Sequence, residues 1–232
     1  MWQELRAELA PQGVEVVTVA LDTGGVEAAG PWIDAASPEH PSLIDRAHLL
    51  GELLGVVNVP TGVWIDEEGV LVRPPEVAHP GRSVLRDMFA EHGIPKDGPA
   101  YLLETLAEVG RIQVRPERYG AALRDWAANG ADSRFALDPD EVVARSRPRP
   151  PEHSQAAAHF ELGQHLHRAG DVDGAREHFR SAHRLDGDNW TYRRQAWSFE
   201  DPLQGPTEHY DSDWVADVRR SGPESYYPLP DL

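Results

Sequence analysis

Residues 14–21 are the strongest constraint on the fold. The run from Val14 to Leu21 is rich in β-branched residues and almost continuously apolar. Such a run is typical of a parallel strand that is covered on both faces, because a strand with one exposed face would alternate apolar and polar residues. We therefore expect a central parallel strand here, joined to its neighbours by right-handed crossovers.

The surrounding segments alternate between helical and extended patterns. Apolar spacing and turn residues predict helices over 2–10, 26–33, 47–54 and 83–91, an extended segment over 40–45, and a β-hairpin over 56–72 that turns at Glu67-Glu68-Gly69. The last of these helices is expected to cover the sheet. Helices and strands in this order predict an α/β layer fold.

The pattern changes after Gly98. Helices are predicted at 101–109, 117–128 and 139–145. The run Arg147-Pro148-Arg149-Pro150-Pro151 cannot lie inside a helix, because each proline removes a backbone donor and restricts the residue before it. We therefore predict a helical region that ends in a linker at 147–151.

Charge and composition exclude several classes of function. The chain has 232 residues and a formal net charge of −17, which repels phosphate backbones and anionic membrane surfaces, so we expect neither nucleic-acid nor membrane binding. Cysteine is absent, which removes disulfides, thiolate metal sites and cysteine nucleophiles. Since neither a transmembrane nor a secretory pattern occurs, the sequence predicts a cytoplasmic protein.

The hairpin segment is similar to part of a known fold. The run from Asn58 to Asp66 (NVPTGVWID), with the Gly turn after it and a Leu-rich helix before it, resembles the thioredoxin-like fold, in particular its TlpA/ResA branch. The resemblance covers roughly residues 1–93. It implies a cis proline and a backbone that pairs with an extended substrate segment, and so it nominates Val59, Pro60 and Thr61 as substrate-binding residues. The alternative is a trans proline that enters an edge strand.

The same resemblance implies a missing part. Family members place a strand and a Cys-x-x-Cys motif at the start of the first long helix, whose N-terminus stabilises the attacking thiolate. The chain begins at Met1, within that helix, and carries neither feature. Either its start lies downstream of the true one or the domain has lost its redox centre, and in both cases the chain as given cannot exchange disulfides. The missing strand would leave unpaired backbone on its neighbour, where a partner or a second copy of the chain can add a strand.

A second resemblance follows the linker. Residues 156–189 resemble one tetratricopeptide repeat of about 34 residues. Its signature positions hold Leu162, Gly163, Gly170, Ala175, Phe179 and Ala182, while His159, Leu166 and Gly187 depart from the signature. One repeat cannot bury both faces, so we expect it to pack on a capping helix at 190–199 and on the helices between 98 and 145. Two alternatives stay open, a groove that binds a partner and a packed helical extension without one.

Other candidate sites have structural explanations. The chain has 11 histidines, but the spacing of His159, His165 and His167 does not bring three ligands to one helix face, and no HExxH motif occurs. We therefore predict no metal, no cofactor and no catalytic residue. A hydrolase or lyase that uses His and Asp groups is a third alternative.

Aromatic residues crowd the C-terminal stretch. They are Trp190, Tyr192, Trp197, Tyr210, Trp214, Tyr226 and Tyr227. Aromatic side chains supply a large contact area, so such a stretch either wraps its own domain or docks a partner. We favour wrapping.

These features predict an α/β chain in four parts. They are a truncated thioredoxin-like domain (1–95), a helical connecting region (96–146), a tetratricopeptide-like hairpin with a capping helix (152–200) and an aromatic-rich tail (201–232). We predict a non-catalytic binding or scaffold protein in thiol-redox or stress physiology, which binds a protein or peptide and can self-associate through an exposed sheet edge. The alternative is a thiol-disulfide oxidoreductase or peroxiredoxin-like reductase whose first strand and Cys-x-x-Cys are missing from this sequence.

Overall fold

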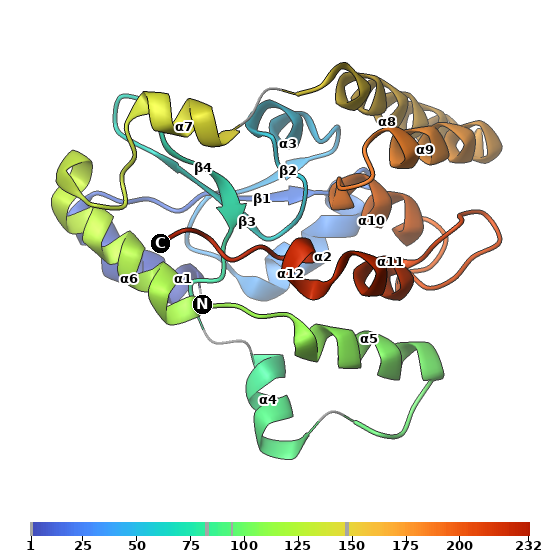
Figure 1. Cartoon of the computed structure of the whole chain (residues 1–232), viewed down its shortest axis with the longest axis horizontal. Coiled ribbons are helices and arrows are strands. Elements are labelled where there is room, and N and C mark those ends of the chain that lie inside the picture. Colours follow the sequence, from blue (N-terminus) through green and yellow to red (C-terminus); the bar gives the residue numbers. More distant parts are fainter. Residues whose placement is uncertain (1, 82–83, 94, 147–148) are drawn as a thin grey trace. The chain divides into compact units, whose positions relative to one another are not determined.

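The chain folds into two compact units that contain both helices and strands (Figure 1). The computed structural model describes residues 2–81, 84–93, 95–146 and 149–232. Unit 1 comprises Met1–Gly81, Arg115–Pro148 and Pro230–Leu232, and unit 2 comprises Arg82–Val114 and Arg149–Leu229. The units therefore do not follow the four predicted ranges, because the predicted connecting region 96–146 is divided between them at residue 115. Arg147 and Pro148 of the predicted linker lie outside the described residues.

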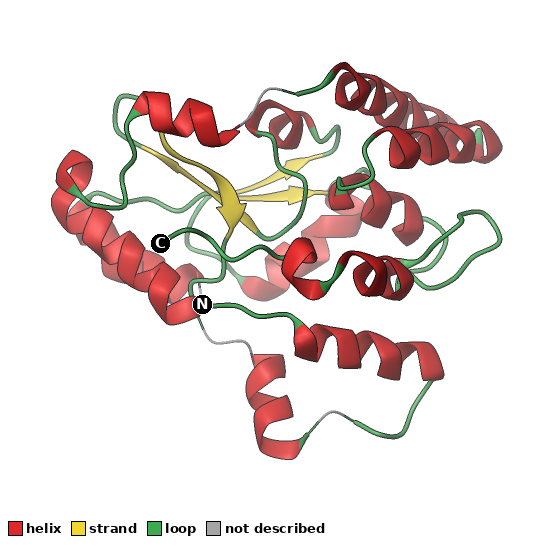
Figure 2. Cartoon of the chain, in the orientation of Figure 1, coloured by secondary structure: helices red, strands yellow, loops and turns green. Residues whose placement is uncertain are grey.

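Unit 1 holds the strands of the described residues, shown in yellow in Figure 2. Its helices and strands are α1 (Trp2–Leu9), the 3-10 helix η1 (Ala10–Gln12), β1 (Thr18–Leu21), α2 (Val26–Ala36), β2 (Ser42–Asp45), α3 (Leu49–Leu54), β3 (Thr61–Ile65), β4 (Leu71–Val77), α6 (Pro116–Asn129), the 3-10 helix η2 (Gly130–Asp132) and α7 (Pro139–Ser146). The alternation of helix and strand confirms an α/β class.

The strands form two small sheets. β1 and β2 run parallel, with Thr18 opposite Ser42, whereas β3 and β4 run antiparallel, with Thr61 opposite Val77. Within the described residues, β1 is hydrogen-bonded to β2 alone and β3 to β4 alone. The parallel direction of the first strand is confirmed, but its central position is wrong, because β1 lies at a sheet edge and is only half-buried along its length.

The β3–β4 hairpin follows the sequence signal closely. The Asp66 carboxylate accepts hydrogen bonds from the backbone N–H groups of Glu68 (3.1 Å) and Val70 (2.7 Å). Gly69 adopts a φ of +81°, which side chains with a Cβ rarely allow. Both features are typical of a tight turn, and the predicted hairpin is confirmed.

The helix that packs on β3 is not the predicted one. The segment expected to cover the sheet forms a helix, but that helix belongs to unit 2, and its predicted first residue, Ser83, lies outside the described residues. In unit 1, α6 takes this role, because its Tyr119 packs edge-on against Trp64 of β3. Tyr119, Trp64, Leu9 and Phe135 belong to one buried cluster that forms the core of unit 1.

The regular secondary structure of unit 2 is all helical within the described residues, and loops connect its helices. Its helices are α4 (Val84–His92), α5 (Ala100–Arg111), α8 (Pro151–Ala169), α9 (Val172–Leu185), α10 (Trp190–Ser198), α11 (Trp214–Ser221) and α12 (Pro223–Tyr226). α8 and α9 lie side by side as a hairpin, and α10 packs on α9 (Figure 1). The core is aromatic: Phe160, Phe179, Trp190, Tyr192, Trp197, Trp214 and Tyr226 are all buried. The C-terminal aromatic residues thus wrap their own unit, as expected.

Candidate functional site

The turn that precedes β3 is shaped by its own side chains. The Asn58 Oδ1 atom accepts a hydrogen bond from the backbone N–H of Val59 at 2.8 Å, and Thr61 Oγ1 donates to the Asn58 carbonyl at 2.6 Å. The Val59–Pro60 peptide bond is cis, as the resemblance implies. The carbonyl of Pro60 accepts a hydrogen bond from the N–H of Ala78 at 3.1 Å, which ties the turn to the end of β4.

The three nominated residues are partly exposed to solvent, and the backbone that carries them is held by hydrogen bonds. Val59, Pro60 and Thr61 are each half-buried, whereas Asn58 is 5% exposed. The nominated residues therefore present part of their surface while the turn beneath them is fixed. The Val59 N–H is already held by Asn58, so any added strand must pair with other backbone groups of this region.

Helix α6 packs against β3 through a buried pair of aromatic side chains, Trp64 and Tyr119. Trp64 Nε1 donates a hydrogen bond to the hydroxyl of Tyr119 at 3.0 Å, and both side chains are buried. Burial raises the pKa of the Tyr119 hydroxyl above its ordinary value, so this hydroxyl stays protonated at neutral pH. A Cβ on Gly62 would collide with the Tyr119 hydroxyl, which leaves glycine as the residue that fits.

The edges of the sheets carry exposed apolar side chains. Ile65 at the end of β3 is 49% exposed, and Val57 just before the turn is 46% exposed. On the other sheet, Leu43 of β2 is 52% exposed, and Val17, which directly precedes β1, is also 52% exposed. Strand edges with free backbone groups and apolar side chains are able to pair with a further strand.

The α8–α9 hairpin brings together most of the predicted repeat positions. Gly163, Ala175, Phe179 and Ala182 are buried between the helices, where the Phe179 ring lies over Gly163. Leu162, in contrast, is 41% exposed. The hairpin geometry therefore agrees with the predicted contact of small residues, and Leu162 lies on its outer surface.

The histidines of α8 have different surroundings, and one of them pairs with a histidine of α9. His159 and His178 face each other across the hairpin with their Nδ1 atoms 2.8 Å apart, so one nitrogen carries the proton that the other accepts. His167 stacks on Phe199 with ring centroids 3.7 Å apart, and burial lowers its pKa. In the part of the chain that the structure describes, no three His, Asp or Glu side chains lie where they could share a metal ion.

Sequence reasoning missed the residues that support the turn. Asn58 carried a usable signal, because asparagine commonly binds nearby backbone groups in turns. Tyr119 carried none, because it lies 55 residues from Trp64 along the chain and nothing local marks the pair.

Known proteins add no constraint to this site. Comparisons of the chain with protein-family models, curated proteins and solved structures found no match. Among the described helices, none combines the length and the apolar character needed to cross a bilayer.

Proposed function

We propose that the protein is a non-catalytic binding module that captures an extended protein segment at the free edge of β3, beside Val59, Pro60 and Thr61. The observation that carries the proposal is the pairing of β3, which within the described residues is hydrogen-bonded to β4 alone. An open strand edge offers a row of backbone N–H and C=O groups to an added strand.

The proposed fold is a truncated thioredoxin-like sheet. In this interpretation a strand of the family fold that has no counterpart among the described residues accounts for the single neighbour that each of β1 and β3 has there. It also accounts for the apolar run at 14–21, which has the composition of a strand with covered faces although β1 is half-buried. The link to thiol-redox or stress physiology follows from this resemblance, and a cytoplasmic location stays part of the same proposal.

Preorganisation of the turn favours binding. Asn58 and Thr61 fix the backbone ahead of β3, and Trp64 is anchored to Tyr119 behind it. Little conformational entropy of this surface is therefore lost when a partner adds a strand. The exposed side chains of Val57 and Ile65 supply apolar contacts at the two ends of the same segment.

Unit 2 is proposed as a tetratricopeptide-like scaffold. Its hairpin buries the small signature residues and leaves Leu162 exposed. One repeat offers a small surface, so the principal binding site is assigned to the edge of β3 and not to the hairpin.

The test uses extended peptides selected from a display library against the full chain. The selected peptide should slow amide hydrogen exchange in β3. Methylation of alternate backbone nitrogens in the peptide should weaken binding by about tenfold for each hydrogen bond lost. Exchange protection confined to unit 2, or unchanged affinity after methylation, would overturn the proposal.

Two variants locate the site. Asn58→Ala removes the acceptor that holds the Val59 N–H and should weaken peptide binding. Leu162→Ser, on the outer surface of the hairpin, is the matched control and should leave peptide binding unchanged.

Light scattering decides whether a second copy of the chain binds to the same edge of β3. Insulin reduction by this cysteine-free chain would contradict the non-catalytic assignment.

A further inference from the structure

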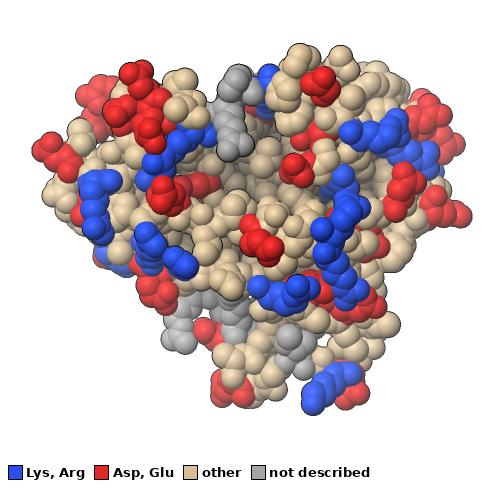
Figure 3. Space-filling model, viewed as in Figure 1, with Lys and Arg blue, Asp and Glu red and all other residues tan. Residues whose placement is uncertain are grey.

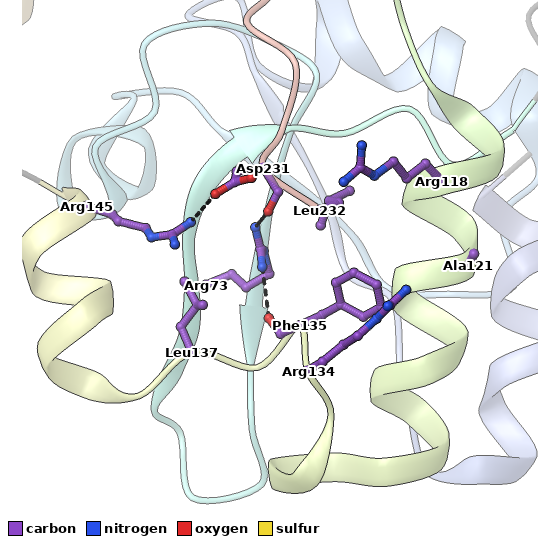
Figure 4. Close-up of a pocket in the computed structure, with 9 residues that line it drawn as sticks. All are labelled: Arg73, Arg118, Ala121, Arg134, Phe135, Leu137, Arg145, Asp231 and Leu232. Atoms are coloured by element: carbon purple, nitrogen blue, oxygen red, sulfur yellow. Dashed lines mark hydrogen bonds and ion pairs between the residues drawn. The ribbon is translucent and has the colours of Figure 1, made fainter.

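Unit 1 contains a cavity of about 530 Å³ that is lined by arginines from several elements. Arg73 comes from β4, Arg118 from α6, Arg134 from the loop before α7 and Arg145 from α7 (Figure 4). Figure 3 shows basic side chains gathered over the region of α6 and α7, with acidic ones beside them. In a chain with a formal net charge of −17, this concentration of guanidinium groups needs a local explanation.

Two of the arginines are engaged within the unit. Arg73 is 2% exposed and donates to the Glu76 carboxylate at 2.7 and 3.0 Å, to the Phe135 carbonyl at 2.9 Å and to the Asp231 carbonyl at 2.8 Å. Arg145 donates to Glu141 at 2.6 Å and to the Asp231 carboxylate at 3.1 Å. Their hydrogen bonds hold β4, α7 and the C-terminal residues together.

Within the described part of the chain, Arg118 and Arg134 have no such partner. Among the described residues, no carboxylate lies within ion-pair distance of Arg118 or Arg134. The Arg134 guanidinium lies over the Phe135 ring, 4.5 Å from its centroid, and the Arg118 side chain extends from α6 toward Leu232 (Figure 4). Two guanidinium groups without a carboxylate partner among the described residues thus lie beside the apolar side chains of Phe135 and Leu232. These two residues are 8% and 9% exposed.

This combination suits one class of ligand. A guanidinium group presents a planar fork of donors that matches the oxygens of a phosphate or a carboxylate. The adjoining ring and aliphatic side chain provide contacts for an apolar body. We infer that the cavity binds a small organic anion, with its oxyanion group held by Arg118 and Arg134 and its apolar part placed on Phe135 and Leu232.

Asp231 has a defined part in this site. Its carboxylate is already at the cavity, bound to Arg145, so it repels an incoming anion and competes with it for guanidinium donors. Removal of this charge should therefore strengthen binding, whereas a purely structural role of the arginine cluster predicts no gain. The site does not use the free edge of β3 and is independent of the proposed function.

The test is calorimetric titration of the full chain at constant ionic strength with phenyl phosphate, benzoate and inorganic phosphate. Phenyl phosphate or benzoate should bind more tightly than inorganic phosphate, because they alone carry a ring for Phe135. The stronger of the two identifies the ligand as a phosphate ester or a carboxylate. Inorganic phosphate that binds as tightly as both would overturn the organic ligand, and no binding by any probe at about 10 mM would overturn the site.

Variants separate the site from general charge effects. Arg118→Gln and Arg134→Gln should each weaken binding about tenfold, and Asp231→Asn should strengthen it severalfold. Arg115→Gln is the matched control, because Arg115 is exposed at the start of the same helix α6 and does not line the cavity. It should change affinity by less than about twofold. Equal losses in the Arg115 and Arg118 variants, or no loss in the Arg118 and Arg134 variants, would refute the inference.

Discussion

The contact of Gly163 with the Phe179 ring sets how closely α8 and α9 approach. A Cβ on Gly163 would lie 2.7 Å from Cε1 and 2.8 Å from Cδ1 of that ring, well inside van der Waals contact. Gly163 and Phe179 lie on different helices that are packed along their length, so the clash cannot be relieved by a terminal side-chain movement alone.

We therefore predict that Gly163→Ala destabilises unit 2. The clash costs about 1–3 kcal/mol, and the better helix propensity of alanine returns at most about 1 kcal/mol. The free energy of unfolding should fall by about 1–2 kcal/mol, measured by urea denaturation followed by circular dichroism.

The control is a double-mutant cycle with Phe179→Leu, which removes the ring that the new methyl group meets. Each single variant should destabilise, but the Gly163→Ala change should cost much less in the Phe179→Leu background. Simple additivity of the two changes would show that this contact does not limit the helix separation.

The sequence was a good guide to residues whose partners lie nearby in the chain. The small residues of the hairpin could be predicted because Gly163 and Phe179 are on consecutive helices. The turn at Asp66 could be predicted because its hydrogen bonds are local. The Arg73 contacts could not, because its acceptors at Phe135 and Asp231 lie 62 and 158 residues away.

Among the elements, the C-terminal helices are held by aromatic contacts. Trp214 Nε1 in α11 donates a hydrogen bond to the Tyr226 hydroxyl in α12 at 3.1 Å, and the Trp190 ring of α10 meets Tyr226 edge-on with centroids 4.5 Å apart. Tyr226 is 3% exposed. The last helix of unit 2 therefore seals part of its core.

We predict that deletion of residues 221–232 lowers the thermal stability of unit 2. Loss of the buried Tyr226 ring alone should cost about 3–5 kcal/mol. The measurement is the melting temperature by scanning calorimetry. Deletion of 230–232 is the control, because those residues belong to unit 1. An unchanged melting temperature after the longer deletion would instead favour partner docking by the aromatic stretch.

Elements were predictable where a local pattern specifies them. The positions of most helices follow from apolar spacing and from stops such as Gly55, which ends α3 with a φ of +72°. The edge position of β1 was not predictable. Its apolar composition indicates that both faces of the strand suit burial, but it does not indicate whether a second strand pairs with it. The covering role of α6 was missed for a related reason, since its contact with β3 depends on the distant pair Trp64 and Tyr119.

At the scale of the whole molecule, the chain passes between two units that have separate cores. The core of unit 1 includes Trp64 and Tyr119, and that of unit 2 includes Phe179 and Trp197. Segment 115–148 returns to unit 1 after unit 2 has begun. No composition change marks this return, because α5, α6 and α7 are all ordinary amphipathic helices whose partners are chosen by tertiary contacts. Separate cores lead us to expect two unfolding transitions.

His183 should make one of those transitions sensitive to acid. Its ring packs against Trp197 and Tyr210 with centroids 6.3 and 5.4 Å away, and its Nε2 atom is buried. Burial, with a contribution from the charge of Arg193, lowers the pKa of His183 from its ordinary 6.5 to about 3. The unfolded chain therefore binds a proton at this ring near pH 6.5, whereas the ring stays neutral in the folded unit at that pH. The contribution of the neutral His183 ring to the stability of unit 2 is therefore fully present above pH 6.5 and is lost as the pH falls toward 3.

We predict that unit 2 loses about 2 kcal/mol of stability between pH 7 and pH 5 because of this one group. Calorimetric scans at pH 7, 6 and 5 should show one transition moving to lower temperature. The leucine of His183→Leu cannot bind a proton, so the melting temperature of unit 2 should depend less on pH in this variant. The melting temperature of the other transition should depend on pH as it does in the unsubstituted chain. Glu108 and Glu200 contribute little in this window, because arginine partners lower their folded pKa and the stability they contribute is lost only as the pH falls below the ordinary value of 4.5, where the unfolded chain takes up those protons. An undiminished pH dependence in His183→Leu would contradict the assignment of the acid sensitivity to this ring.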